Sequence, residues 1–220
     1  RGQTLAVIGA TGSGKSTLIS LIPRFYDATE GAVLVDGVNV RDYAFDALYD
    51  RLGYVTQKAV LFSGSIGDNV LFGESAAPQD AGNTARAIDI SQAAEFVNAL
   101  EEGTNYRIAQ QGRNVSGGQK QRLAIARAIA RQPEILIFDD SFSALDYKTD
   151  AALRRELAEK LPDATKIIVA QRISTIRHAD KIIVLDRGEA VGIGTHDELM
   201  RSCRVYQEIA TSQLSAAELA

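Results

Sequence analysis

The stretch that decides the fold reads Gly9-Ala10-Thr11-Gly12-Ser13-Gly14-Lys15-Ser16-Thr17. It fits the phosphate-binding pattern Gly-x4-Gly-Lys-Ser/Thr. A short apolar, partly β-branched run of strand type, residues 4–8, precedes it, and an apolar run to Ile22 follows it. The pattern therefore predicts a loop that joins a strand to a helix, and Pro23 is expected to end that helix.

Each residue type in this loop has a physical reason. Glycines let the backbone turn without Cβ clashes, so that N–H groups and the helix N-terminus converge on an anion. Lys15 is predicted to reach the β and γ phosphates of a nucleotide, and Ser16 to offer its hydroxyl to Mg²⁺, which prefers hard oxygen ligands. A glycine-rich turn without function is the alternative, but the flanking strand and helix favour nucleotide binding. The candidate nucleotide-binding residues of the loop are Gly9, Thr11, Gly12, Ser13, Gly14, Lys15, Ser16 and Thr17.

The composition bounds the class of protein. The chain has 220 residues, of which 45% are hydrophobic, so a sizeable core is expected. Its net charge of -4 argues against a protein that coats nucleic acid, because polyanion binding normally requires a basic excess. The one cysteine, Cys203, excludes a cysteine-based metal cluster. No apolar run approaches the ~18 residues of a membrane-spanning helix, so another segment is expected to supply any membrane part.

Strand and helix patterns alternate along the chain. Asp36-Gly37 predicts a hairpin turn between two short strands within residues 31–40. The other predicted strands span residues 52–56, 134–140, 165–170, 181–185 and 190–193. Residues 61–70 are expected to form a loop with apolar anchors, and helices are expected within 78–100 and over 151–161.

Several side chains in these segments are interpreted as structural. Arg154 and Arg155 are expected on the outward face of their helix. Thr195 and Glu198 form a capping-box pattern that opens the last helices. His178 and His196 are interpreted as surface or capping-turn histidines, and residues beyond about Ser212 are expected to fray.

A second phosphate-type helix start lies at Asn114-Val115-Ser116-Gly117-Gly118-Gln119. Ser116 is suited to cap a helix, and the glycines expose N–H groups where partial positive charge favours an anion. Pro133 ends this helix, and the apolar run that follows predicts a parallel strand buried on both faces. Asp139, at the carboxyl end of that strand, fits the carboxylate that holds Mg²⁺ in P-loop enzymes.

Together these residues resemble the nucleotide-binding domain of ATP-binding cassette (ABC) transporters. The motifs follow in the family's order: Walker A at 9–16, the Q-loop glutamine Gln57, the signature at 115–119, Walker B at 135–139, and a D-loop that ends at Asp146. Leu61-Phe62-Ser63-Gly64-Ser65-Ile66 with Asp68-Asn69 resembles exporters rather than importers.

The resemblance implies an α/β fold with a P-loop NTPase (RecA-like) core, a mainly parallel sheet, antiparallel hairpin insertions and a helical subdomain. This subdomain, about 66–130, would be inserted in a core formed by 1–65 and 131–220. ATP and Mg²⁺ are the implied ligands, and Ser16, Gln57 and Asp139 the implied metal ligands. Two domains would dimerise head to tail at the cytoplasmic face of the cell membrane. Ser116, Gly117, Gly118 and Gln119 would then serve the partner's nucleotide, and Asp146 is a further implied nucleotide-binding residue.

Two departures from the family pattern concern the catalytic positions. The family usually has glutamate where this chain has Asp140, and histidine where it has Gln171. Aspartate is one methylene shorter, and a misplacement of ~1 Å can cost ~10²-fold in rate. Glutamine donates hydrogen bonds but cannot become cationic. Because the signature stays close to the family form, with Val115 for leucine, the chain resembles the degenerate half of a heterodimeric exporter.

A third departure is that the aromatic residue on which adenine stacks is expected farther upstream than Arg1, as if this domain were cut from a longer transporter subunit. The motifs also allow two alternatives. An ATP-gated clamp of chromosome or repair type also has a Ser-Gly-Gly-Gln signature, but a long coiled coil splits its cassette. In the other reading, this half holds ATP only as structural glue of the dimer, while the non-identical partner turns over.

Overall fold

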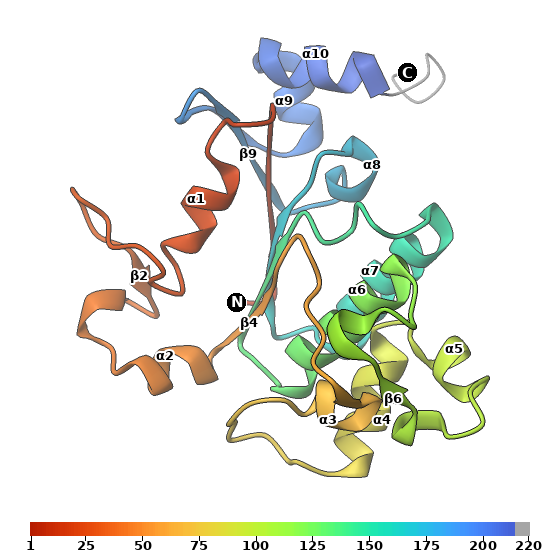
Figure 1. Cartoon of the computed structure of the whole chain (residues 1–220). Coiled ribbons are helices and arrows are strands. Elements are labelled where there is room, and N and C mark those ends of the chain that lie inside the picture. Colours follow the sequence, from red (N-terminus) through yellow and green to blue (C-terminus); the bar gives the residue numbers. More distant parts are fainter. Residues whose placement is uncertain (214–220) are drawn as a thin grey trace.

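A computed structural model describes residues 1–213 of the chain. Its centre is a six-stranded sheet with the strand order β10-β9-β1-β8-β7-β4 (Figure 1). Neighbouring strands are parallel throughout, except that β10 pairs with β9 antiparallel. The strands are β1 (Thr4–Gly9), β4 (Leu52–Val55), β7 (Ile135–Asp139), β8 (Thr165–Val169), β9 (Lys181–Asp186) and β10 (Glu189–Gly194). The predicted α/β fold with a mainly parallel sheet is confirmed.

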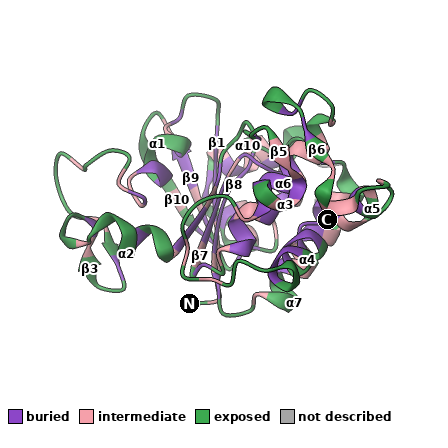
Figure 2. Cartoon of the chain, turned by 60° about the horizontal axis from the view of Figure 1, so that its bottom comes forward, coloured by how far each residue is buried: buried purple, intermediate pink, exposed green. Residues whose placement is uncertain are grey.

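The two faces of the sheet belong to different apolar clusters. Val7 of β1 packs in a cluster with Ile19 of α1 (Lys15–Ser20), whereas Ala6 and Ile8 pack with α6 (Gly117–Ala130). Successive side chains of a strand point to opposite faces, so α1 and α6 cover opposite sides of the sheet. Figure 2 shows the inner strands of the sheet and much of α6 as buried, whereas the edge strand β10 is mostly exposed. The apolar run of β7 is buried on both faces, as the sequence predicts.

The remaining elements surround this sheet. Two short hairpins pair β2 (Leu34–Val35) with β3 (Val38–Asn39) and β5 (Gly64–Ser65) with β6 (Arg107–Ile108). The other α-helices are α2 (Phe45–Asp50), α3 (Ile66–Val70), α4 (Ala81–Ile90), α5 (Ala94–Asn98), α7 (Tyr147–Lys160), α8 (Ile173–Ile176), α9 (His196–Ser202) and α10 (Arg204–Gln213). Short 3-10 turns are η1 (Val40–Asp42), η2 (Gly103–Asn105) and η3 (Gln110–Gly112). None of the helices within residues 1–213 is both long and apolar enough to cross a membrane.

Three local expectations were wrong. Residues 61–70 are not all loop, because Ser65 and Asp68 form a capping box that starts α3. Helix α7 begins at Tyr147 rather than at residue 151, because Asp146 caps it. Arg154 does not point outward; its guanidinium donates a 2.7 Å hydrogen bond to Asp150, whose side chain is 1% exposed.

The two expectations for the C-terminal part of the chain, a capping box and fraying of the last residues, have different outcomes. Thr195 and Glu198 form the predicted capping box at the start of α9. Ser212 lies within α10, and the expected fraying of residues 214–220 falls outside the described residues.

Candidate functional site

The loop between β1 and α1 has the backbone conformation that its glycines predict. Gly12 and Gly14 have φ angles of 81° and 97°, in the left-handed region that glycine adopts without steric cost. Gly14 is the N-cap residue of α1, and no side chain of the described chain caps this helix. The first backbone N–H groups of α1 therefore lack partners within the helix. They and the helix dipole favour an anion at this end.

Lys15 brings a cation into this loop. Its ammonium group donates 2.8 Å hydrogen bonds to the backbone carbonyls of Gly9 and Ala10. The side chain is buried, and burial lowers its pKa, while the negative charges of Asp140 and Asp139 oppose this shift. The loop cation thus lies close enough to both carboxylates to interact with them.

Ser16 and Asp139 meet where α1 approaches the end of β7. The Ser16 hydroxyl donates a 2.7 Å hydrogen bond to Asp139 Oδ1, and the Tyr54 phenol donates a longer one of 3.4 Å to Asp139 Oδ2. Burial, reinforced by the Asp139 charge, raises the pKa of Tyr54, so this phenol stays a neutral donor. Sequence reasoning missed Tyr54, because only the pairing of β4 with β7 brings it to Asp139.

Asp140 follows β7 and joins two glutamine side chains. Its Oδ2 accepts a 2.6 Å hydrogen bond from Gln171 Nε2 and a 3.1 Å hydrogen bond from Gln57 Nε2. Gln57 follows β4 and Gln171 follows β8, so the two neighbours of β7 in the sheet supply the donors. The fold therefore brings together three predicted site residues that lie far apart in the sequence. Because the amide nitrogen of Gln57 donates to Asp140, its amide oxygen is the side-chain atom available to bind a cation.

The backbone and the carboxyl group of Asp140 are both unusual. Its φ of 48° lies in the left-handed region, where aspartate is several-fold enriched among non-glycine residues. The residue is 6% exposed, and burial raises the pKa of its carboxyl group. The hydrogen bonds from Gln171 and Gln57 oppose this shift, and the charge of Asp139 adds to it. Asp140 consequently retains its proton to a higher pH than an exposed aspartate.

The donor set at this edge of the sheet fits a phosphate group with Mg²⁺. Ser16, Asp139 and Gln57 offer hydroxyl, carboxylate and amide oxygens, which are the hard donors that Mg²⁺ prefers. The Ser13 hydroxyl is buried in the loop without a hydrogen-bond partner among residues 1–213. A Cβ atom at Gly12 would meet nothing within 4 Å. The loop thus has an unused hydroxyl and open space beside its N–H groups, which a phosphate could use.

The segment from Ser116 to Gln119 starts α6, on the opposite side of the sheet from α1 (Figure 1). The Ser116 N–H donates to Gln119 Oε1 at 2.8 Å, and the Gln119 N–H donates to Ser116 Oγ at 3.3 Å. A Cβ atom at Gly117 would meet nothing within 4 Å, and one at Gly118 would lie 3.5 Å from the Ala144 carbonyl. The fold therefore does not bring this segment to the Lys15 loop of the same chain.

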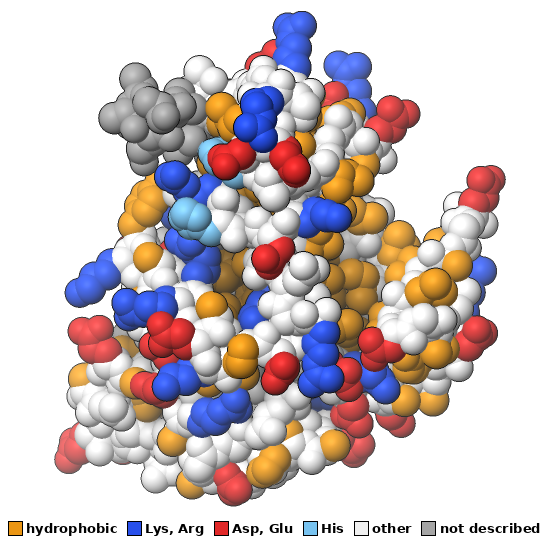
Figure 3. Space-filling model, turned by 180° about the vertical axis from the view of Figure 1, so that it is seen from behind, with side chains coloured by type: hydrophobic (Ala, Val, Ile, Leu, Met, Phe, Trp, Pro, Cys, Tyr) orange, Lys and Arg blue, Asp and Glu red, His pale blue; other side chains and the backbone are white. Residues whose placement is uncertain are grey.

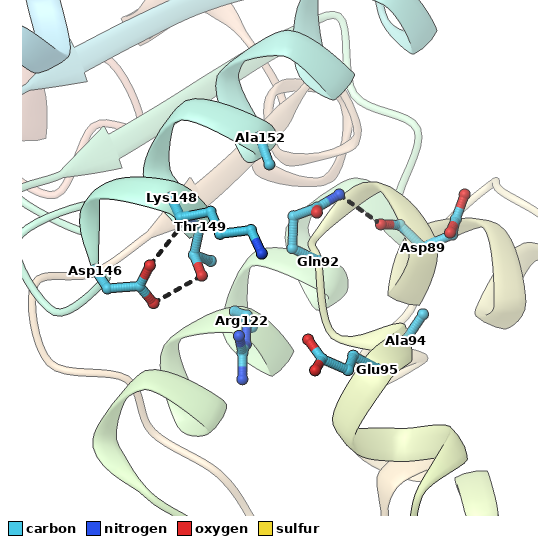
Figure 4. Close-up of a pocket in the computed structure, with 9 residues that line it drawn as sticks. All are labelled: Asp89, Gln92, Ala94, Glu95, Arg122, Asp146, Lys148, Thr149 and Ala152. Carbon is cyan, nitrogen blue, oxygen red and sulfur yellow. Dashed lines mark hydrogen bonds between the residues drawn. The ribbon is translucent and has the colours of Figure 1, made fainter.

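Asp146 lies near the same helix and caps α7. Its carboxylate accepts a 2.9 Å hydrogen bond from the Thr149 N–H and a 2.8 Å one from the Thr149 hydroxyl, and these bonds lower its pKa. Figure 4 shows Asp146 and Thr149 at one side of a pocket that α6 also lines through Arg122. Asp146 thus belongs with the Ser116 segment rather than with Lys15.

The contacts of the two histidines fit a structural role. His178 and His196 line one pocket together with Asp197, on the face seen in Figure 3. His196 is the first residue of α9, and its Nδ1 lies 2.8 Å from the Tyr206 hydroxyl. This contact fits the interpretation of His196 as a capping-turn histidine.

The arrangement defines a class of protein. A mostly parallel sheet carries a phosphate-type loop after its first strand and two carboxylates at the carboxyl end of β7, which is typical of P-loop nucleotide-binding domains. The chain belongs to the ABC transporter family, since the family model described as ABC transporter matches residues 1–143. The resemblance found in the sequence is thereby confirmed.

Individual relatives agree with this family. An uncharacterised ABC transporter ATP-binding protein of Mycobacterium tuberculosis is 48% identical over 98% of this chain and 37% of its own length. A Bacillus subtilis protein named as a multidrug export ATP-binding/permease protein is 42% identical over 97% of this chain and 36% of its own length. The structure of a bacterial Atm1-family ABC exporter with ATP bound matches with a TM-score of 0.90 and 36% identity, over 96% of this chain and 37% of that one. The chain thus spans little more than a third of the length of these relatives.

Proposed function

We propose that this chain is the ATP-binding and ATPase domain of an ABC exporter and that it acts at the cytoplasmic face of a membrane. The observation that carries the proposal is the 2.7 Å hydrogen bond between Ser16 of the loop and Asp139, beside the cation of Lys15. The relatives named for multidrug export and the exporter structure support the transport part. Membrane-spanning domains would lie outside residues 1–220.

Within this proposal each residue of the site has a chemical role. The loop N–H groups and Lys15 would bind the β and γ phosphates, and Ser16, Asp139 and Gln57 would hold Mg²⁺. When bound, Mg²⁺ would neutralise phosphate charge. Gln171 would donate a hydrogen bond to the γ-phosphate, and Asp140 would orient the attacking water. The hydrogen bond between Gln171 and Asp140 supports a joint role for these two side chains.

The partner is proposed to be a second, non-identical nucleotide-binding domain in head-to-tail orientation. Support comes from α6, which lies on the opposite side of the sheet from this chain's own phosphate loop, so that its start is free to serve the loop of a partner. Gly117 is open to an approaching molecule, because no atom lies within 4 Å of a Cβ built there. A helical subdomain of about 66–130 is also proposed. Helices α3, α4, α5 and α6 fall within these residues, and α3 and α4 both pack against α6.

Hydrolysis at the site built on this chain is proposed to be slow. The carboxylate of Asp140 is shorter than the usual glutamate and engages two glutamine amides, so it is poorly placed to deprotonate a water. Gln171 cannot shuttle a proton. In the limiting form of this proposal, ATP bound at this site only holds the two domains together and is not hydrolysed there.

Nucleotide binding is tested by Lys15→Ala. Loss of a charge-assisted hydrogen bond typically costs about 1.5–3 kcal/mol, so Mg-ATP affinity should fall on the order of 10- to 100-fold in a calorimetric titration. Lys166→Ala is a matched control, because Lys166 is also buried, also has a pKa lowered by burial, and donates to a backbone carbonyl. Equal affinity in the Lys15 variant and the unmodified chain would refute the proposed function.

A further inference from the structure

The last described helix, α10, reaches the segment that contains Gln171. The side chain of Gln213 accepts a 2.9 Å hydrogen bond from the Ile173 N–H and donates a 2.7 Å hydrogen bond to the Gln171 carbonyl. One amide group therefore binds the backbone on both sides of Arg172. This two-bond contact joins the C-terminal helix to the turn between β8 and α8.

The contact replaces a missing local cap. Arg172 is the N-cap residue of α8, and its side chain makes no capping hydrogen bond. The first N–H groups of a helix need partners from outside that helix, and Ile173 is the first residue of α8. Gln213 supplies this partner from an element 40 residues away in the sequence.

The helix that presents Gln213 is firmly anchored. Helix α10 packs against α8, β1 and β9, and its residues Tyr206 and Ala210 are completely buried. The Gln213 side chain itself is exposed, so it contributes little to the apolar core. The Arg172 side chain itself adds only longer contacts, since its guanidinium donates 3.4 Å hydrogen bonds to the carbonyls of Ser143 and Leu145.

We infer that Gln213 is a positioning residue for Gln171. By fixing the peptide groups on either side of Arg172, it sets the direction in which the Gln171 side chain leaves the backbone. That side chain donates the 2.6 Å hydrogen bond to Asp140, so the C-terminal helix acts on the candidate catalytic pair through the backbone. The inference rests on the proposed function, because its catalytic consequence requires that this pair face ATP.

The test compares Gln213→Ala with Gln207→Ala in the full-length subunit assembled with its partner domain. Gln207 is a matched control, since it is a glutamine of the same helix whose side chain donates a 2.8 Å hydrogen bond to the Met200 carbonyl. Amide hydrogen exchange is measured at Ile173 without nucleotide, and single-turnover hydrolysis and affinity are measured with Mg-ATP. Gln213→Glu is added, because its carboxylate keeps the acceptor for Ile173 but loses the donor to Gln171.

We expect faster exchange at Ile173 in Gln213→Ala only, with retained protection in Gln213→Glu and Gln207→Ala. Hydrolysis should fall about tenfold in Gln213→Ala, because a misplacement of ~1 Å costs up to ~10²-fold, while Mg-ATP affinity stays unchanged. Unchanged exchange at Ile173 overturns the inference whatever the nucleotide result. So does an unchanged hydrolysis rate after protection is lost, or an equal loss of rate in Gln207→Ala. Failure of the unmodified chain to bind Mg-ATP would instead refute the proposed function, which separates the two failures.

Discussion

At the scale of single residues, Asp140 combines a left-handed backbone, burial and two amide donors. Its φ of 48° suits aspartate or asparagine better than glutamate, because a short polar side chain tolerates this region. Burial works against the charged form, and the hydrogen bonds from Gln57 and Gln171 favour it. The departure from the family's usual glutamate thus lies at a position where the backbone itself favours the shorter side chain.

The raised pKa of Asp140 predicts a pH-dependent stability effect for Asp140→Asn. Between the ordinary and the raised pKa, the folded chain binds a proton that the unfolded chain has released, so this carboxyl group's contribution to stability decreases as pH rises. Asparagine does not titrate, tolerates the same φ, and its amide oxygen still accepts from both glutamines. We therefore expect the stability of the variant relative to the unmodified chain to increase from about pH 3 to pH 7. Denaturant unfolding across this range measures the difference, and a constant difference would contradict the shift.

Sequence reasoning found the site residues that follow strands and missed those that depend on strand order or remote helices. Lys15, Ser16 and Asp139 lie in local patterns whose chemistry is readable from spacing. Tyr54 reaches Asp139 only because β4 pairs with β7. Gln213 reaches Gln171 only because α10 packs on α8, and a glutamine near a chain end carries no local signal of that contact.

At the scale of elements, the sequence predicts strands more accurately than the starts of helices. Apolar runs located the strands, whereas the spacing of apolar residues did not locate where helices begin. The buried strand β7 and the Asp36 hairpin were readable because burial on both faces and turn chemistry are local properties. The starts of α3 and α7 were missed, because they depend on the caps Ser65 and Asp146 rather than on apolar periodicity. Arg154 was misplaced because its partner, Asp150, is a buried carboxylate that also accepts from Thr175 of α8.

The N-terminus of α6 supplies a prediction of its own. In Gly117→Asp, the new side chain meets open space and a negative charge at a helix start is favourable, so the chain should fold normally. In the proposed dimer this carboxylate would oppose the partner's phosphates, and hydrolysis at the partner's site should fall about tenfold or more. Nucleotide binding at this chain's own loop should be unchanged when each site is trapped separately.

Ala81→Asp is the matched control for this variant. Ala81 is the exposed first residue of α4, so the substitution places the same charge at the start of a different helix. It should leave both sites unaffected. Equal losses at both sites in Gly117→Asp would contradict the head-to-tail arrangement.

At the scale of the whole molecule, binding and turnover depend on different parts of the fold. The phosphate loop joins β1 to α1, whose first residues are Lys15 and Ser16, whereas the Asp140–Gln171 pair depends on β7 and β8. A domain can therefore keep its affinity for ATP while losing the geometry for hydrolysis. In a heterodimer this separation would give one fast and one slow site.

The last prediction tests this separation in the assembled transporter. The site built on this chain should bind Mg-ATP but hydrolyse it at least ~10²-fold more slowly than the partner's site, a barrier difference of about 2.7 kcal/mol. Asp140→Glu combined with Gln171→His should raise turnover at this site if chemistry is limiting, because a longer carboxylate and a titratable imidazole can align and deprotonate water. Nucleotide affinity should change little, since neither substitution touches the loop. Glutamate at the left-handed position is expected to lower stability somewhat, so the single variants are measured as well. Equal single-site turnover in the unmodified heterodimer would leave an ordinary ATPase domain in which Asp140 and Gln171 replace the usual pair without loss.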